Sequence, residues 1–267
     1  MNKLKALFNN RIIGMIHVGA LPGSPKFEGS IDRLVDKACE EAELYKICQV
    51  GGIMVENMHD IPYVQSKYFG PEVTATLTKV CWEIKRTLDS RIPCGLQILA
   101  GGNIEALAVA KICDYQFVRA EGFIYSHIAD EGFMDANAGH LLRYRKYLNA
   151  ENVLIFTDIK KKHCSHTITS DLTISDVAKA AEFFLSDGLV LTGTRTGQPA
   201  STSDLEKVKE ATNLPVLIGS GITVDNVECY SQADAFIVGS YFKKDGRWEN
   251  DVSKDNVMKL MEKVSKM

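Results

Sequence analysis

Residues 214–223 read LPVLIGSGIT, and residues 233–240 read ADAFIVGS. Each stretch contains a short apolar run that ends in glycine and serine, and a segment of helical pattern separates the two runs. Buried strands that alternate with helical segments are typical of βαβ units in a parallel sheet. This part of the chain is therefore predicted to form two parallel strands, each ending in a Gly-Ser turn, with one helix between them.

The two Gly-Ser turns have the composition of an anion-binding site. Glycine lets the backbone approach a ligand closely and leaves amide N–H groups free to point at it. In a (β/α)8 barrel, the loops after the seventh and eighth strands often hold a phosphate in this way. We therefore predict that five residues bind phosphate: Gly219, Ser220, Gly221, Gly239 and Ser240.

Six further strand-then-helix units precede this pair. Their apolar runs are residues 12–17, 53–56, 95–99, 117–119, 153–159 and 188–191. The helical segments start at capping residues or proline, among them Ser30, Pro71, Ser175, Ser203 and, for the last helix, Ser253. Eight such units without a linker predict a single (β/α)8 barrel domain over residues 1–267. The alternative is an open doubly wound sheet, but the first strand lacks the GxGxxG motif.

The composition is ordinary for a globular protein, with 45% hydrophobic and 24% charged residues. The net charge is −3 and no basic block stands out, so we expect no nucleic-acid partner. The seven cysteines are scattered without a CxxC pair, which is typical of reduced residues in a cytoplasmic protein. Asn9, Asn10 and Arg11 interrupt the N-terminal apolar stretch and argue against a secretory signal. No apolar run approaches the ~20 residues of a transmembrane helix.

Active-site side chains of this fold come from the C-terminal ends of the strands. His17 ends the first strand and has the parity of Ile13 and Met15, so the three should share a face. If that face is the barrel interior, His17 lies at the mouth and can act as a general base or a metal ligand. The alternative is a histidine that is hydrogen-bonded to a loop carbonyl.

Glu56 and Asn57 end the second strand, and Asp60 lies just beyond. A carboxylate at a strand end is costly to bury unless it has a partner. An ion pair with Arg119 would supply one, and so would a divalent metal shared with Asp158. Because alternate residues of a strand face opposite sides, at most one of residues 56 and 57 faces the barrel interior.

The segment Asp158-Ile-Lys160 follows the fifth strand, and a period of two places Phe156, Asp158 and Lys160 on one face. A strand-end Asp and Lys can move protons, and a desolvated lysine can form a Schiff base. Lys160 opens a run of three lysines that is typical of a solvated loop, so we favour substrate binding or proton relay over an imine. His163 and His166 have the spacing of a zinc pair, without further spaced ligands.

Residues 192–197 read TGTRTG, a loop rich in hydroxyl groups and glycine next to the first Gly-Ser turn. Thr192 and Thr194 suit a phosphate or a sugar hydroxyl. The alternative is an ordinary connecting loop with turn residues, and the two nearby Gly-Ser turns favour binding.

Several of these stretches resemble the BtpA/SgcQ family. They are IIGMIHVGALPGSP (12–25), GGIMVEN (51–57), FTDIKKKHCSH (156–166), LTGTRTGQPAS (191–201) and LIGSGITVDNV (217–227). The resemblance covers residues 11–245 and implies a TIM barrel of the ribulose-phosphate-binding kind. It implies no settled reaction, since one branch is associated with photosystem I biogenesis and another carries a nucleoside-triphosphatase label. This chain has no P-loop. The family motifs imply these site residues: His17, Glu56, Asn57, Asp60, Asp158, Lys160, His163 and Thr194.

Three functions compete. The first is an enzyme, a lyase, isomerase or hydrolase, that acts on a sugar phosphate or nucleotide. The second is a hydrolase that uses a divalent metal held by His17, Glu56 and Asp158, and the third is a non-catalytic assembly factor. We favour the first and assign catalytic roles to His17, Glu56, Asp158 and Lys160, and substrate-binding roles to Asn57, Asp60, Arg119, His163, Thr192 and Thr194. The sequence leaves the oligomeric state open, a homo-oligomer included.

Overall fold

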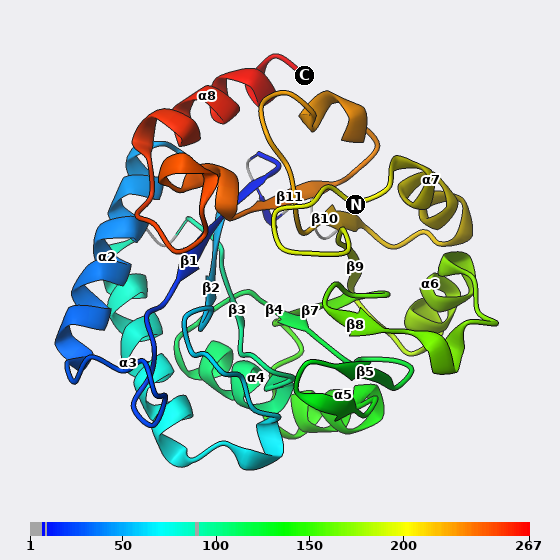
Figure 1. Ribbon diagram of the computed structural model, residues 1–267, viewed down its shortest axis with the longest axis horizontal. Coiled ribbons are helices and arrows are strands. Elements are labelled where there is room, and N and C mark those ends of the chain that lie inside the picture. The colour runs from blue at the N-terminus through cyan, green and yellow to red at the C-terminus, as the bar shows by residue number, and fades with distance from the viewer. Residues whose placement is uncertain (1–6, 9, 89–90) are drawn as a thin grey trace.

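Eight parallel strands close into a barrel in the computed structural model, which describes residues 7–8, 10–88 and 91–267 (Figure 1). In their order around the barrel, the strands are β1 (Ile12–His17), β2 (Gly52–Glu56), β3 (Cys94–Gln97), β4 (Phe117–Ala120), β7 (Leu154–Asp158), β9 (Gly188–Leu191), β10 (Val216–Ile218) and β11 (Ala235–Val238). The barrel closes because β11 pairs with β1, with Phe236 opposite Ile12. The predicted (β/α)8 fold is confirmed, and the open doubly wound sheet is excluded.

Helices surround the barrel on its outside (Figure 1). They are α2 (Ile31–Ile47), α3 (Pro71–Thr87), α4 (Asn103–Ile112), α5 (Ala138–Tyr147), α6 (Ile174–Phe183), α7 (Thr202–Ala211) and α8 (Lys254–Ser265). Several begin where the sequence predicts: the Ser30 side chain caps α2, Pro71 opens α3, and the Ser253 side chain caps α8. None of the described helices is long and apolar enough to cross a membrane.

Two buried clusters of apolar side chains hold the fold together. Inside the barrel, residues from alternate strand positions pack against each other, among them Ile13, Met15, Met54, Phe117 and Phe156. The opposite faces of the strands pack against the helices in a larger cluster. The predicted parity of the first strand is therefore confirmed, and it brings the next residue of that face, the strand-end histidine, to the barrel mouth.

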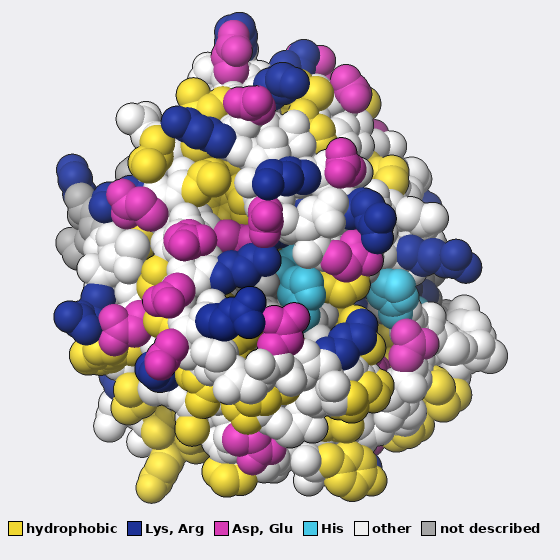
Figure 2. All heavy atoms as spheres, turned by 60° about the vertical axis from the view of Figure 1, so that its left-hand side comes forward, with side chains coloured by type: hydrophobic (Ala, Val, Ile, Leu, Met, Phe, Trp, Pro, Cys, Tyr) yellow, Lys and Arg dark blue, Asp and Glu magenta, His cyan; other side chains and the backbone are white. Residues whose placement is uncertain are grey.

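Charged side chains of both signs are interspersed over the face shown in Figure 2, which brings the left-hand side of Figure 1 forward. Some of them pair between neighbouring helices, as Lys79 of α3 does with Asp32 of α2 at 2.6 Å. Such exposed pairs contribute about 0–1 kcal/mol each, so the helices are held mainly by their apolar faces.

Two predicted helix caps are wrong by two residues. Helix α6 begins after Thr173 instead of at Ser175, because the Thr173 hydroxyl accepts from the Asp176 amide while the Asp176 carboxylate accepts from the Thr173 amide. Helix α7 is capped by Ser201 instead of Ser203, since the Ser201 hydroxyl accepts from the Asp204 amide at 3.1 Å.

The α-helix predicted between the two Gly-Ser turns is replaced by a short 3₁₀ turn, η3 (Val227–Tyr230). The Asn226 side chain donates to Gly221 O at 2.8 Å and accepts from the Thr223 amide at 2.9 Å. An asparagine that bonds local backbone in this way competes with helix formation and favours a turn.

A small antiparallel sheet forms in segments that were predicted as loops. Its strands are β6 (Gly132–Met134), β5 (His127–Ala129) and β8 (Cys164–Ser165). Gln65, from the loop after β2, donates to Glu131 O at 2.7 Å and joins this sheet to the neighbouring loop. The sheet thereby stiffens the long connections that follow β4 and β7.

Candidate active site

Three polar side chains lie in one row across the first three strands. His17 is in register with Glu56, and Glu56 is in register with Gln97. All three are buried, with 6%, 7% and 2% of their surfaces exposed. Glu56 and Gln97 line a cavity of about 300 Å³ at the barrel mouth, which we call the mouth cavity. Its wall includes Arg119, Glu121, Lys161, Lys162, Arg195 and Trp248.

His17 lies at the barrel mouth and has the contact with a loop carbonyl that the sequence offered as one alternative; its role as a general base stays a prediction. Its Nδ1 lies 3.2 Å from Trp248 O, and because a carbonyl can only accept, Nδ1 carries the proton. Its Nε2 then faces Glu56, at 3.8 Å from Oε2. Burial and the positive charge of Lys243 lower the pKa of His17 well below its usual value, so the imidazole is neutral near pH 7.

Glu56 and Gln97 lack the partners that buried polar groups normally have. Among the described residues, no group donates a hydrogen bond to the Glu56 carboxylate, and the Gln97 Oε1 atom accepts none. Burial raises the pKa of Glu56 despite the attraction of Arg119 and Lys162. Unsatisfied buried groups beside a cavity favour the interpretation that a ligand completes their hydrogen bonding.

The Glu56–Arg119 ion pair, one of the two alternatives offered for Glu56 by the sequence, does not form among the described residues. Arg119 instead forms a bidentate pair with Asp158, at 2.9 Å from Nε to Oδ2 and 2.7 Å from Nη2 to Oδ1. Both side chains are almost fully buried. This pair fixes the guanidinium in the wall of the mouth cavity and uses both oxygens of Asp158.

The lysine run after β7 is partly buried and does not form the solvated loop that the sequence suggested. The Lys161 ammonium bonds Glu121 Oε1 at 2.7 Å, and Glu121 Oε2 accepts from the Gly101 amide at 2.9 Å. Burial alone would raise the pKa of Glu121, but Lys161 and the amide outweigh it and lower that pKa. Lys162 lines the mouth cavity, and burial and the nearby Arg119 lower its pKa.

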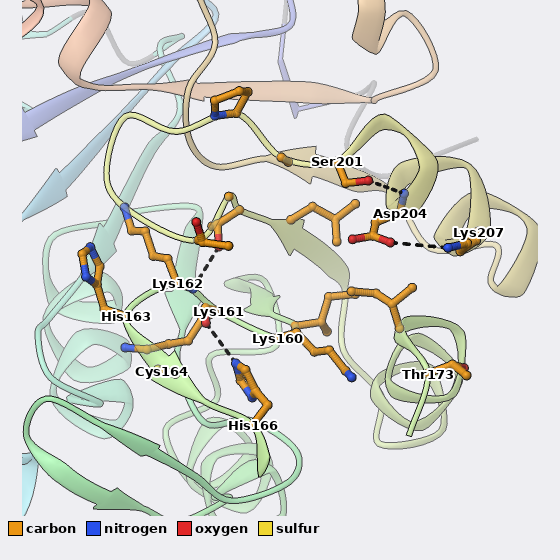
Figure 3. A pocket seen from close by; sticks show the side chains of 18 of the residues that line it. Lys160, Lys161, Lys162, His163, Cys164, His166, Thr173, Ser201, Asp204 and Lys207 are labelled. Atoms are coloured by element: carbon orange, nitrogen blue, oxygen red, sulfur yellow. Dashed lines mark hydrogen bonds and ion pairs between the residues drawn. The ribbon is translucent and has the colours of Figure 1, made fainter. Parts of the chain in front are cut away.

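Lys160 does not share the inward face of Phe156 and Asp158. Its backbone has φ +45°, which ends the extended alternation of the strand. The ammonium turns away from the mouth cavity and donates to Leu172 O at 2.6 Å (Figure 3). The position predicted for Lys160 is therefore taken by Lys162.

Asn57 and Asp60 organise the loops around the mouth. Asn57 is fully buried, donates to Leu99 O at 3.0 Å and accepts from the Leu99 amide at 2.7 Å. Asp60 accepts from the Leu21 amide at 3.1 Å. Because these bonds join the loops after β1, β2 and β3, the two side chains hold the rim of the mouth.

The loop after β9 packs over the first Gly-Ser turn. The Ser220 hydroxyl accepts from the Gly193 amide and donates to Gln198 O, both at 2.8 Å. Gly221 has φ +69°, and a Cβ there would lie 2.2 Å from Pro199 N. Only glycine fits this close contact, and it joins the turn after β10 to the loop after β9.

The remaining predicted site residues lie around the same loop. Thr192 Oγ1 accepts from the Lys162 amide at 3.1 Å. His163 Nε2 accepts from the Thr196 amide at 3.2 Å, which leaves the His163 proton on Nδ1. Thr194 forms a hydrogen bond with Gln198 within the loop.

At the second Gly-Ser turn, a Cβ on Gly239 would lie 3.2 Å from the His17 ring, and Gly197 lies close to the Ser240 hydroxyl. Gly219 lies near Arg119.

The proposed metal ligands do not form a metal centre. Within the residues that the structure describes, no three His, Cys, Asp or Glu side chains are placed to hold an ion. Asp158 is committed to Arg119, and His17 presents one nitrogen to Glu56 and the other to a carbonyl. The donor set therefore does not fit a divalent metal.

Sequence reasoning did not assign roles to Gln97, Glu121, Lys161, Lys162, Arg195 or Trp248. Position at a strand end makes Gln97, Glu121 and Arg195 candidates from the sequence alone, but it gives them no role. The inward turn of Lys162 depends on the backbone conformation of the preceding residues, for which the sequence has no signal.

The chain matches the BtpA family over residues 8–266. An uncharacterised mitochondrial protein of Caenorhabditis elegans is 46% identical over 257 residues, which cover 95% of this chain and 92% of that protein. The photosystem I biogenesis protein BtpA of Synechocystis sp. is 30% identical, with 96% of this chain and 88% of that protein covered.

Two solved structures share the fold of this chain. KGPDC from Streptococcus mutans superposes with a TM-score of 0.61 at 12% identity and covers 96% of this chain and 98% of its own. Phosphoribosyl anthranilate isomerase from Thermus thermophilus has a TM-score of 0.59 at 10% identity, with the same coverage. At such low identity these likenesses show the fold alone.

Proposed function

The chain belongs to the BtpA family, and on that premise we propose that it is an enzyme acting on a small phosphorylated substrate at the barrel mouth. One observation carries the proposal: the buried Gln97 Oε1 atom accepts no hydrogen bond, and the neighbouring Glu56 carboxylate, whose side chain is 10% exposed, accepts none from the described residues, both at the mouth cavity. Leaving a buried group such as the Gln97 oxygen unsatisfied costs about 1–3 kcal/mol. A substrate with hydroxyl groups would remove that cost.

Glu56 is the proposed acid–base residue. Its raised pKa makes the carboxylate a stronger base than a surface glutamate, and the neutral His17 beside it can share the proton. Lys162, whose pKa shifts in the opposite direction, is the proposed ammonium partner. Paired groups with opposite shifts are characteristic of sites that transfer protons.

These roles favour proton transfer at a carbon next to a carbonyl. Glu56 would take the C–H proton, and the electron pair of that bond would move onto the carbonyl oxygen. Lys162 would stabilise the resulting enolate, a role typically worth several kcal/mol in a site shielded from water. Chemistry of this kind belongs to isomerases and lyases.

The phosphate of the substrate is assigned to the turns after β10 and β11. Among the described residues, the backbone amides of Gly221 and Ser240 donate to no protein group. Arg195 borders the mouth cavity with no carboxylate within 4 Å in the described part of the chain, and a guanidinium can bind phosphate through two hydrogen bonds. A Cβ on Gly239 would lie 3.2 Å from the His17 ring, and this proximity supports a phosphate site beside the reacting groups.

The name of the Synechocystis relative raises the alternative of an assembly factor without catalysis. A barrel that kept only a scaffolding role would have no need for an unpartnered carboxylate at a cavity. Because that group costs stability, its presence supports the enzyme.

Ligand binding and carbon-bound proton exchange would test the proposal. A thermal-shift panel of sugar phosphates and nucleotides should identify compounds that raise Tm, and each binder is then incubated with the protein in D₂O. We expect deuterium at the carbon next to the carbonyl, detected by NMR, and no incorporation with the Glu56→Gln variant. The proposal fails if no phosphorylated compound binds, or if both proteins exchange equally.

A further inference from the structure

A second and larger cavity, of about 730 Å³, lies beside the barrel mouth (Figure 3). It is bounded by the C-terminal ends of β7 and β9 and by the first turns of α6 and α7. We call it the side cavity, and its lining includes Lys160, Thr173, Ser175, Ser201, Asp204 and Lys207. Apart from residues shared with the mouth cavity, the proposed function uses none of this lining.

The side cavity carries an excess of positive charge. Four lysines, residues 160–162 and 207, line it against the single carboxylate of Asp204. Lys160 donates to a neutral carbonyl, and Asp176, the carboxylate among the described residues with which it interacts electrostatically, is not within ion-pair distance. Lys207 lies 3.8 Å from Asp204, with the two side chains 57% and 43% exposed, so this pair is weak. In the described chain no carboxylate lies within 4 Å of Lys160 or Lys162.

The side cavity and the mouth cavity share a wall. Lys161, Lys162 and His163 line both of them. The Lys162 amide donates to Thr192 Oγ1, which anchors this wall to the end of β9. The two cavities are therefore neighbours, with these three residues between them.

The size and charge of the side cavity favour an extended anion. Pockets for small organic ligands have volumes of about 300–1,000 Å³, so the mouth cavity alone is at the lower end of that range. The first turns of α6 and α7 also border the cavity, although each carries an aspartate, Asp176 and Asp204, that offsets the positive end of its helix. A ligand that fills only the mouth would leave Lys160 and Lys162 without a carboxylate within 4 Å among the described residues.

We propose that the side cavity is a second anion-binding subsite, and that the substrate is doubly phosphorylated, as in a sugar bisphosphate or a nucleoside diphosphate. This inference rests on the proposed function and specifies its substrate class. Lys160 and Lys207 hold the second phosphate through charge-assisted hydrogen bonds, while the first phosphate occupies the turns after β10 and β11. The same anion chemistry could come from free inorganic phosphate, which the experiment distinguishes.

The test compares wild-type protein with the Lys160→Met/Lys207→Met double variant by isothermal titration calorimetry. The ligands are a pentose monophosphate, alone and with inorganic phosphate, a pentose bisphosphate and a nucleoside diphosphate. We expect at least one doubly phosphorylated compound to bind wild-type protein ~10-fold or more tighter than the monophosphate, as two charge-assisted bonds allow. The double variant should lose this advantage and bind the monophosphate within ~2-fold of wild type.

Two controls separate the subsite from general effects of charge and folding. Lys259→Met removes an exposed lysine of α8 and should preserve both affinities. Lys207→Met alone, at a side chain that is mostly exposed, should retain the wild-type fold and lose part of the advantage.

Four results would overturn the inference. If the double variant keeps the advantage, or if wild-type protein binds mono- and doubly phosphorylated compounds equally, the subsite does not exist and the proposed function stands. If inorganic phosphate restores tight binding of the monophosphate, the second anion is a separate molecule. If no compound binds at all, the proposed function and the inference fail together.

Discussion

The two sides of the barrel mouth are built in different ways. From β1 to β7, strand ends present charged and amide side chains, which we call the charged arc: His17, Glu56, Gln97, Arg119 and Asp158. From β9 to β11, the strand ends present glycine and serine, which we call the glycine arc: Gly193, Gly219, Ser220, Gly221, Gly239 and Ser240. Both arcs face the same opening of one barrel.

The two arcs differ in whether their polar groups have hydrogen-bond partners within the protein. In the charged arc, Arg119 and Asp158 neutralise each other, whereas Glu56 and Gln97 are left without partners. In the glycine arc, Ser220 uses its donor and its acceptor within the protein. The charged arc is thus suited to changing protonation during a reaction, and the glycine arc to holding a group still through backbone contacts.

The largest expected effect comes from breaking the ion pair of the charged arc. Asp158→Asn removes the carboxylate and leaves the buried Arg119 guanidinium without its bidentate partner, with only the more distant Glu56 and Glu121 charges nearby. We expect a loss of about 3–5 kcal/mol in the free energy of unfolding. Urea denaturation measures it, with the exposed Asp36→Asn as control. Stability within 1 kcal/mol of wild type would mean that solvent reaches Arg119 and that the pair is not structural.

The second-largest expected effect is on the turnover of a Glu56 variant, which tests whether the reacting group lies in the charged arc. Glu56→Gln keeps the shape of the side chain and removes the proton acceptor. Once the ligand panel has identified a substrate, we expect turnover to fall ~100-fold or more, with little change of fold. The exposed Glu210→Gln should retain full turnover. Turnover near the wild-type rate in the Glu56 variant would move the reacting group elsewhere.

The raised pKa of Glu56 also predicts that the stability difference between wild type and the Glu56→Gln variant depends on pH. Because burial raises the pKa of Glu56, its contribution is most favourable at low pH and is lost as the pH rises through the folded-state pKa. Glu56→Gln should therefore gain stability relative to wild type between pH 5 and pH 8. Thermal unfolding across this range measures the difference, and parallel curves for the two proteins would contradict the shift.

A smaller effect is expected in the glycine arc. Ser220→Ala leaves the Gly193 amide without an acceptor and frees the loop after β9 from its turn. We expect a loss of about 1–3 kcal/mol in the free energy of unfolding and faster hydrogen exchange confined to residues 192–199. Ser231→Ala, at an exposed position, provides the control. Unchanged exchange in this loop would show that packing alone holds it.

The smallest expected effect concerns His17. Burial lowers the pKa of His17, so the folded protein binds this proton less well than the unfolded chain does. Stability from the neutral ring is present above the unfolded-state pKa of about 6.5 and falls as the pH decreases below it. His17→Asn should therefore show a smaller drop in Tm between pH 7.5 and pH 5.5. The exposed His140→Asn should behave like wild type, and an unchanged drop in the His17 variant would show that other groups carry it.

The sequence by itself determined the eight strands, the face of β1 that turns inward and the glycine arc. Apolar runs and their period of two are local sequence patterns that predict strands independently of the tertiary structure. A Gly-Ser pair after such a run likewise predicts a turn from the sequence alone. The sequence also showed that His17, Glu56 and Asp158 end their strands. Because the C-terminal ends of all strands in this fold meet at the barrel mouth, that position was enough to predict where these residues lie.

Only the tertiary structure decided which polar groups meet. Arg119 pairs with Asp158 and not with Glu56 because β4 lies next to β7 in the barrel. Which strands lie next to each other depends on the pairing of distant segments, and the sequence of one segment does not encode it. Lys162 took the place expected for Lys160 because one residue with positive φ broke the alternation. The positions of the Arg119 and Lys162 side chains are thus set by strand pairing and by the backbone conformation of one residue. Both depend on tertiary packing and not on local propensity.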